Sequence, residues 1–175
     1  TLAQTNISGL IEGEYQFELT VTDNSGATAK DTVVVTVNPA VNIPPTADAG
    51  ADQSITLPVN SIILTGSGTD TDGTITNYSW HKIAGPEAYA FGDSTLTQAT
   101  VSSLIEGVYQ FELTVTDNNG ATSKDTVVVT VNPAPNIPPT ADAGVDQTIT
   151  LPTNTISLTG SGTDTDGTIT SYSWH

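Results

Sequence analysis

The chain has 175 residues, with 19 aspartates and glutamates against 3 lysines and a net charge of -16. Such a charge repels nucleic acid and anionic membrane surfaces and attracts cations, so both polyanions are excluded as partners. The absence of cysteine excludes disulfides, thiolate metal sites and a cysteine nucleophile. No run of about 18 apolar residues occurs, so no membrane insertion is expected in this stretch.

A long internal repeat organises the chain. Residues 1–81 realign without gaps on residues 95–175, at an offset of 94, and 66 of the 81 positions are identical. A period of this length corresponds to a whole domain. We therefore predict the C-terminal half of one repeat at 1–41, a complete repeat at 42–134 and the N-terminal half of the next at 135–175. Residues 82–94 occur only once.

This register indicates a stretch of a longer run of repeats. The two end pieces could be completed by neighbouring segments of the same chain or by pairing between molecules, and the sequence leaves both open. If a domain is open at the strand that carries its tryptophan, the unpaired backbone groups of that strand could pair with another chain.

The first predicted strands of the complete repeat lie at 61–67 and 77–81. In the first, alternation places Ile62 and Leu64 inside and Ile63 outside. In the second, Tyr78 and Trp80 share one face, and Trp80 is the expected core tryptophan. Core packing is favoured over a role for Trp80 as a sugar-stacking platform.

The later predicted strands lie at 108–117 and 125–131. Inward positions of the first are Tyr109, Phe111, Leu113 and Val115, and those of the second are Val127, Val129 and Val131. The stretch "DNNG" at 117–120 is typical of a hairpin turn. No segment shows helical periodicity. The sequence therefore predicts an all-β fold of tandem immunoglobulin-like β-sandwiches, with Tyr109 in a tyrosine corner.

The stretches "NIPPTADAGADQSITLP", "LTGSGTDTDGTITNYSW" and "YQFELTVTDNNGATSKDTVVVTV" resemble the PKD (polycystic kidney disease) repeat. Because "W…GP" replaces the commoner "WDFGDG" after Trp80, the likeness is to a bacterial surface-protein variant. The resemblance covers the complete repeat and both partial ones. It implies an extracellular β-sandwich without catalytic activity, found in tandem in surface proteins and as spacers in secreted polysaccharide-degrading enzymes.

Acidic turns suggest a metal site. The turns "TDTDG" and "TDNNG" should lie at the end of the sandwich where the linker enters. There Asp70, Asp72 and Asp117 could converge with Asn42 on a calcium ion, which prefers oxygen ligands, and the resemblance implies calcium at this end of some PKD-like domains. The equivalent candidates in the partial repeats are Asn136, Asp164, Asp166 and Asp23.

Plain turns explain the same residues, because Asp and Gly are common turn formers. An EF-hand starting at Asp70 fails, because glycine stands fourth instead of sixth and position twelve is His81. Asp48 and Asp52 fit a strand edge equally well, and His81 is expected to be an ordinary exposed residue.

Two functions remain in view. The first is a non-enzymatic extracellular stalk, filament or adhesin segment, with joints stiffened by linker prolines and calcium. Its partners would be neighbouring repeats of the same chain or copies of itself, with surface glycans as a further possibility. The second is a spacer or binding module of a secreted polysaccharide-degrading enzyme. A neighbouring catalytic domain in the full gene would favour the second.

Overall fold

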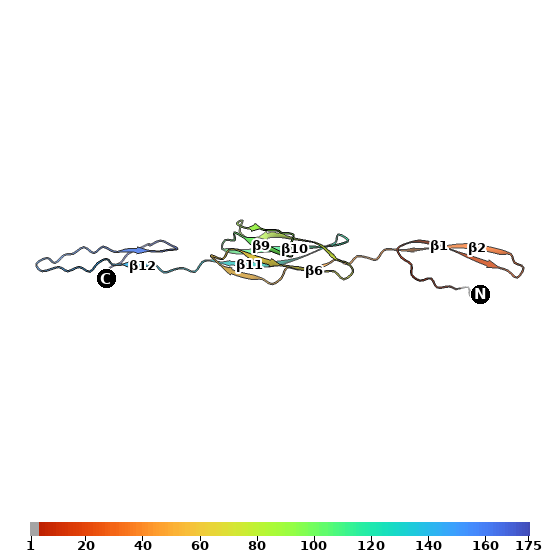
Figure 1. The fold of residues 1–175 in the computed structure, drawn as a ribbon, viewed down its shortest axis with the longest axis horizontal. Helices are drawn as coiled ribbons and strands as arrows, with labels where there is room; N and C mark the ends of the chain where they lie inside the picture. Colours follow the sequence, from red (N-terminus) through yellow and green to blue (C-terminus); the bar gives the residue numbers. More distant parts are fainter. Residues whose placement is uncertain (1–3) are drawn as a thin grey trace.

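The computed structural model describes residues 4–175, and every regular element in this range is a β-strand. The chain forms three parts in a row: an N-terminal hairpin, a central sandwich and a C-terminal extended segment (Figure 1). The hairpin and the C-terminal segment lie at opposite ends, with the central sandwich between them. Among the described residues, no helix is long and apolar enough to cross a membrane.

The strands of the central sandwich run from Thr46 to Asn132 and form two layers. One layer is a four-stranded sheet in the order β4-β11-β10-β7. Its strands are β4 (Gln53–Thr56), β7 (Ile75–Ala84), β10 (Gly107–Asp117) and β11 (Thr122–Asn132). The other layer combines the pair β3-β6 with the sheet β5-β9-β8. Its strands are β3 (Thr46–Asp48), β5 (Ile62–Thr65), β6 (Ser67–Thr69), β8 (Ala90–Phe91) and β9 (Gln98–Ser102).

The core follows the predicted alternation. All the predicted inward residues of β10 and β11 are buried, as are Ile62 and Leu64 of β5, whereas Ile63 is exposed. Trp80 is 1% exposed and donates from Nε1 to the carbonyl of Leu96 at 3.1 Å. These contacts confirm Trp80 as a core residue, and burial of each large apolar side chain contributes about 1.5–3 kcal/mol.

The predicted tyrosine corner is also present. The Tyr109 hydroxyl donates to the carbonyl of Ala88 at 2.9 Å and accepts from the Ile105 amide at 3.0 Å. The Tyr109 ring stacks on Phe111, with centroids 6.0 Å apart. The corner therefore holds the start of β10 against the once-only segment 82–94.

One expected strand is divided in the structure. The stretch 61–67 was expected to run as a single strand, but it breaks at Gly66 into β5, which pairs with β9, and β6, which pairs with β3. A Cβ at Gly66 would lie 2.7 Å from Cζ2 of Trp80 and in contact with the Leu113 side chain. The switch of pairing from β9 to β3 therefore occurs at Gly66, where the Trp80 ring packs against a residue without a side chain.

The two end parts repeat local elements of the sandwich without its second layer. The N-terminal hairpin pairs β1 (Gly13–Thr22) with β2 (Thr28–Val37), in the same register as β10 with β11. The C-terminal segment pairs β12 (Thr140–Asp142) with β13 (Ser161–Thr163), as β3 pairs with β6. Several side chains whose equivalents are buried in the central sandwich are exposed in the end parts, among them Leu19, Leu158 and Trp174. Others in the N-terminal hairpin, such as Tyr15 and Phe17, are half-buried.

Candidate functional site

The candidate site is the end of the central sandwich that receives the linker, here called the linker pole and made of residues 42–43, 70–74 and 117–121. The loop 70–74 connects β6 to β7, and the turn 117–121 connects β10 to β11. Asx turns shape both: the Asp72 amide donates to Asp70 Oδ1, and the amides of Asn119 and Ala121 donate to Asp117 Oδ1.

Asp117 is the buried centre of the linker pole, with 2% of its surface exposed. Its Oδ2 accepts a hydrogen bond from Nδ2 of Asn42, at 2.8 Å, across 75 positions of sequence. This bond lowers the pKa of Asp117 from its ordinary value, burial acts in the opposite direction, and the amides of Ala121, Asn119 and Gly120 lower it further. A charged carboxylate therefore anchors the linker to the domain.

A second bond fixes the next linker residue, because the Ile43 amide donates to Asp72 Oδ2 at 3.1 Å. The two acidic loops are also tied to each other. The Thr74 amide donates to Oδ1 of Asn118 at 2.6 Å. A Cβ at Gly73 would meet that Asn118 oxygen and lie 2.7 Å from Asp70 Oδ2, so only glycine fits between the loops.

Asn118 is a structural residue of the pole that the sequence reasoning missed. The only signal that could have pointed to it is that Asn24 occupies the same position in the other copy, next to the turn aspartate.

The pole has one feature that suits a cation and one that does not. Asp70 Oδ2 is buried and has no hydrogen-bond partner, and a buried carboxylate oxygen usually has one. A cation beside it could use Asp70 Oδ2 and Asn118 Oδ1 as oxygen ligands. However, residues 4–175 contain no group of three Asp, Glu or His side chains close enough to hold a metal ion. The two other candidate carboxylates each accept a bond from the linker: Asp117 from Asn42 Nδ2 and Asp72 from the Ile43 amide.

The candidates in the partial repeats are only partly brought together. In the C-terminal segment the Ile137 amide donates to Asp166 Oδ2 at 3.0 Å, which repeats the contact of Ile43 with Asp72. Asp164 Oδ1 accepts from the amides of Asp166 and Gly167.

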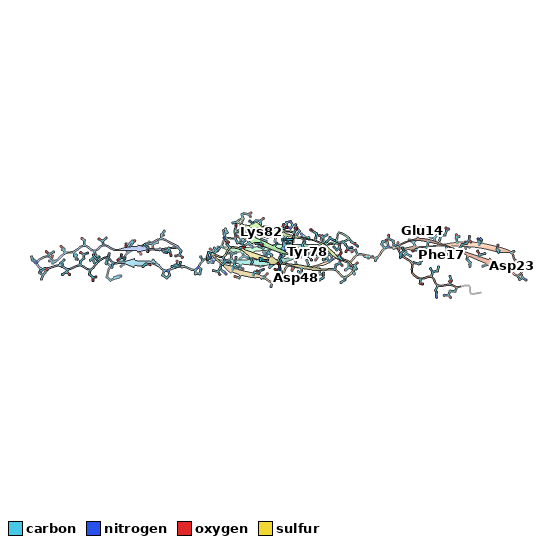
Figure 2. The ribbon with its side chains drawn as sticks, in the orientation of Figure 1. Glu14, Phe17, Asp23, Asp48, Tyr78 and Lys82 are labelled. Atoms are coloured by element: carbon cyan, nitrogen blue, oxygen red, sulfur yellow. The ribbon has the colours of Figure 1, made fainter. Side chains whose placement is uncertain are left out.

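Asp23 and Asn136 are not brought together within one chain. Asp23 Oδ1 accepts from the amides of Ser25 and Ala27 at the turn of the N-terminal hairpin. Figure 2 shows that turn at the far end of the hairpin from the central sandwich. Asn136, the equivalent of Asn42, is exposed in the other end part.

Other candidates have structural contacts. Asp52 Oδ1 accepts from the Val128 amide at 2.8 Å, which joins the start of the domain to β11. Asp48 Oδ1 accepts from the Gly50 amide at 2.8 Å. His81 is exposed at the surface of β7. Asp125 accepts from the Ala49 amide at 2.7 Å and ties the residue that follows β3 to β11.

The comparison with family models decides the family. A model described as "K319L-like, PKD domain" matches residues 1–37, 49–131 and 143–175. The chain belongs to the K319L-like PKD domain family. The match to all three parts agrees with the resemblance to the PKD repeat, and the two-layered all-β architecture is that of the immunoglobulin-like sandwich.

Two proteins and one solved structure show what this K319L-like PKD chain is similar to. The Dyslexia-associated protein KIAA0319 homolog of Mus musculus is 42% identical over 97% of the chain and 16% of its own length. Chitinase A of Pseudoalteromonas piscicida is 33% identical over 61% of the chain and 13% of its own length. The solution structure of the PKD domain from KIAA 1837 protein is 36% identical, covers 55% of this chain and 94% of that one, and has a TM-score of 0.48.

The four KIAA0319-related proteins matched along nearly the whole chain come from mouse, human and rat. The expected assignment to a bacterial surface-protein variant is therefore unsupported, although the PKD assignment itself stands. The chain spans about 16% of the length of those relatives.

Proposed function

We propose that this PKD chain is a non-enzymatic, extracellular structural or adhesive segment, in which sandwich domains follow one another in a stalk or filament with restrained joints. Its neighbours in the stalk are further repeats of the same chain or copies of itself. The linker contacts carry the proposal. Asn42 and Ile43, two linker residues shortly before β3, are bound to Asp117 and Asp72 on two different loops of the domain they precede.

These bonds act where a joint would otherwise bend. The residues before Asn42 include Pro39, and those after it include Pro44 and Pro45, which favour extended backbone over flexible coil. Pro45 is buried, so the linker is packed against the domain as well as hydrogen-bonded to it. A linker that is stiff by composition and bonded at its end transmits the direction of one domain to the next.

Calcium is proposed as an addition to this joint. The buried, unpartnered Asp70 Oδ2 supports it, because a cation would supply the missing partner. The net charge of -16 favours cation binding in general. The ion would be held by Asp70 and Asn118 in the central sandwich. Asp164 is the equivalent of Asp70 in the C-terminal part.

Small-angle X-ray scattering of the dilute 175-residue chain tests the joint. The double variant Asn42→Ala/Asp72→Ala should broaden the distribution of maximum dimensions relative to the native chain. Val41→Ala is the matched control, because Val41 is an exposed linker residue. A native chain that scatters as freely jointed parts would contradict the proposed restraint.

Thermal melting with calcium and with a chelator tests the ion separately. A ligand that binds only the native state raises the midpoint by mass action. The native chain should melt higher with calcium, and Asp70→Asn should remove the difference. Equal midpoints with calcium and with the chelator would contradict calcium binding by the native chain, and the proposal of a hydrogen-bonded joint would still stand.

A spacer in a secreted polysaccharide-degrading enzyme is the second candidate. The match to Chitinase A over 61% of the chain favours it. A catalytic domain encoded beside these repeats would support the spacer, and many further repeats at the same period would support the stalk.

A further inference from the structure

We propose that Asn119 is a site of spontaneous covalent modification, which converts it to aspartate and isoaspartate and loosens the linker pole. Its side chain closes onto the backbone nitrogen of Gly120, and water then opens the ring that forms. The inference goes beyond the proposed stalk function, because the chemistry depends only on the turn 117–121 and takes place whether or not the joint is restrained.

The pair Asn119-Gly120 is unique in the sequence. Asparagine is a thermolabile residue, and ring closure requires the nitrogen of the next residue to approach its side-chain carbon. Glycine has no Cβ to obstruct this approach and has the widest range of backbone conformations. Every other asparagine is followed by a residue that has a side chain. In the N-terminal hairpin, Ser25 precedes Gly26 at the equivalent position, so the reactive pair occurs in only one of the two similar turns.

The folded turn leaves the attacking nitrogen accessible. Asn119 and Gly120 are both exposed. No atom of residues 4–175 lies within 4 Å of the position that a Cβ on Gly120 would take, so the ring has room on that side. The Gly120 amide donates to the Asp117 carbonyl at 3.4 Å. This bond is longer than the usual range of about 2.7–3.2 Å for such bonds. The nitrogen is therefore weakly held.

The contacts of Asn119 prepare its side chain for attack. Its Oδ1 accepts a hydrogen bond from Nδ2 of Asn118 at 2.6 Å. The bond from the Thr74 amide to Asn118 Oδ1 fixes which end of the Asn118 amide faces Asn119. A donor at this oxygen stabilises the negative charge that develops on it when the neighbouring carbon is attacked. The contact between the two acidic loops therefore also activates Asn119.

The reaction consumes one water and releases one ammonia, and nothing is oxidised or reduced. The Gly120 nitrogen gives its proton to solvent and forms a bond to Cγ of Asn119. The bond from Cγ to Nδ2 breaks, and Nδ2 leaves as ammonia after it takes a proton from solvent. Water then opens the resulting five-membered imide. Cleavage between Cγ and the ring nitrogen gives aspartate, whereas cleavage at the main-chain carbonyl gives isoaspartate, in which the chain continues through the side chain.

The isoaspartate product changes the length of the turn. It adds one methylene to the backbone between positions 119 and 120. The turn is closed by the Asp117 amide, which donates to the Ala121 carbonyl at 3.0 Å, and by the Ala121 amide, which donates to Asp117 Oδ1 at 2.8 Å. A longer backbone disturbs both bonds. Because the other oxygen of Asp117 binds Asn42, the change reaches the linker. The aspartate product keeps the normal backbone and adds only a charge.

Peptide mapping by mass spectrometry of the folded 175-residue chain, sampled during warm incubation, tests the modification. The peptide that contains Asn119 should become one mass unit heavier, faster at higher pH because the attacking nitrogen must lose its proton. Electron-transfer fragmentation should find both aspartate and isoaspartate there. Asn24 and Asn118 should react at least about tenfold more slowly, because the next residue has a side chain. A folded chain that keeps Asn119 while the same chain in urea loses it would overturn the proposal, as would equal rates at the three asparagines.

Two variants separate the reaction from its effect on the linker pole. Asn119→Ser copies the turn of the N-terminal hairpin and should stay unmodified under the same incubation, which controls for other damage. Asn119→Asp carries the added charge on a normal backbone. The isoaspartate fraction of the aged native chain, separated by ion exchange, should melt below both the fresh chain and Asn119→Asp by circular dichroism. If the isoaspartate fraction and Asn119→Asp melt at the same temperature, the inferred loosening of the linker pole is wrong.

Discussion

Leu113 and Leu19 provide a matched pair in which the same substitution should have very different costs. Both lie in the seven-residue stretch YQFELTV, at 109–115 and at 15–21. Leu113 is 0% exposed and lies opposite Trp80 in the four-stranded sheet, whereas Leu19 is 61% exposed. Local sequence and strand propensity are therefore held constant, and only the second layer differs.

Leu113→Ala should destabilise the central sandwich by about 2–5 kcal/mol, the range for removing a buried leucine from a packed core. For a domain of this size each kcal/mol lowers the melting temperature by about 4–8 °C, so the melting temperature should fall by more than about 8 °C. In dilute solution Leu19→Ala should cost less than about 0.5 kcal/mol, as exposed substitutions usually do.

Tryptophan fluorescence during thermal and urea unfolding measures both effects. A Trp174→Phe background leaves Trp80 as the only tryptophan, so that the signal reports the central sandwich alone. The reasoning is refuted if both substitutions lower the midpoint equally, or if Leu113→Ala costs less than about 1 kcal/mol.

Three further predictions concern the linker pole and the tyrosine corner. Asn42→Ala should lower the melting temperature by several degrees, measured by circular dichroism, because Asp117 then loses its linker partner. The pKa of Asp117 lies below its ordinary 3.8, so its stabilising effect is present above about pH 4 and is lost as the pH falls through the lowered value; Asp117→Asn should reduce the slope of acid unfolding there. Tyr109→Phe should destabilise the central sandwich by about 1 kcal/mol in urea, whereas Tyr15→Phe should leave the Trp80 transition unchanged, because the Tyr15 hydroxyl bonds only within its own exposed hairpin.

The core of the fold could be predicted because its signal is local. Alternation with a period of two assigns the inward face of β10 and β11 without knowledge of any partner strand, and the structure confirms each of these residues. The division of the stretch 61–67 could not be predicted in this way. It depends on the Trp80 ring and the Leu113 side chain occupying the space beside Gly66, which is a contact between distant parts of the chain.

The position of the linker pole could be predicted from the sequence, but the hydrogen-bond partners of its side chains could not. Topology alone puts the loops 70–74 and 117–121 at the end where the linker enters, and turn aspartates were expected there. The side chains then find partners that spacing does not reveal. Asp117 takes an amide 75 positions away, and Asn118 takes the Thr74 amide across the loops. Either hydrogen bonds or a bound cation can stabilise a charged carboxylate. The acidity of the loops alone therefore could not distinguish a hydrogen-bonded turn from a cation site.

The near-identity of the copies means that residues 135–175 carry no information that distinguishes a hairpin in the same chain from a hairpin in another copy. Effective concentration then decides, because a covalently attached partner competes at roughly millimolar local concentration. An attached partner would also bring the equivalent of residues 82–94, and with it the edge-on aromatic cover that Phe91 gives Phe111. Both effects favour closure within one chain wherever the complete repeat is present.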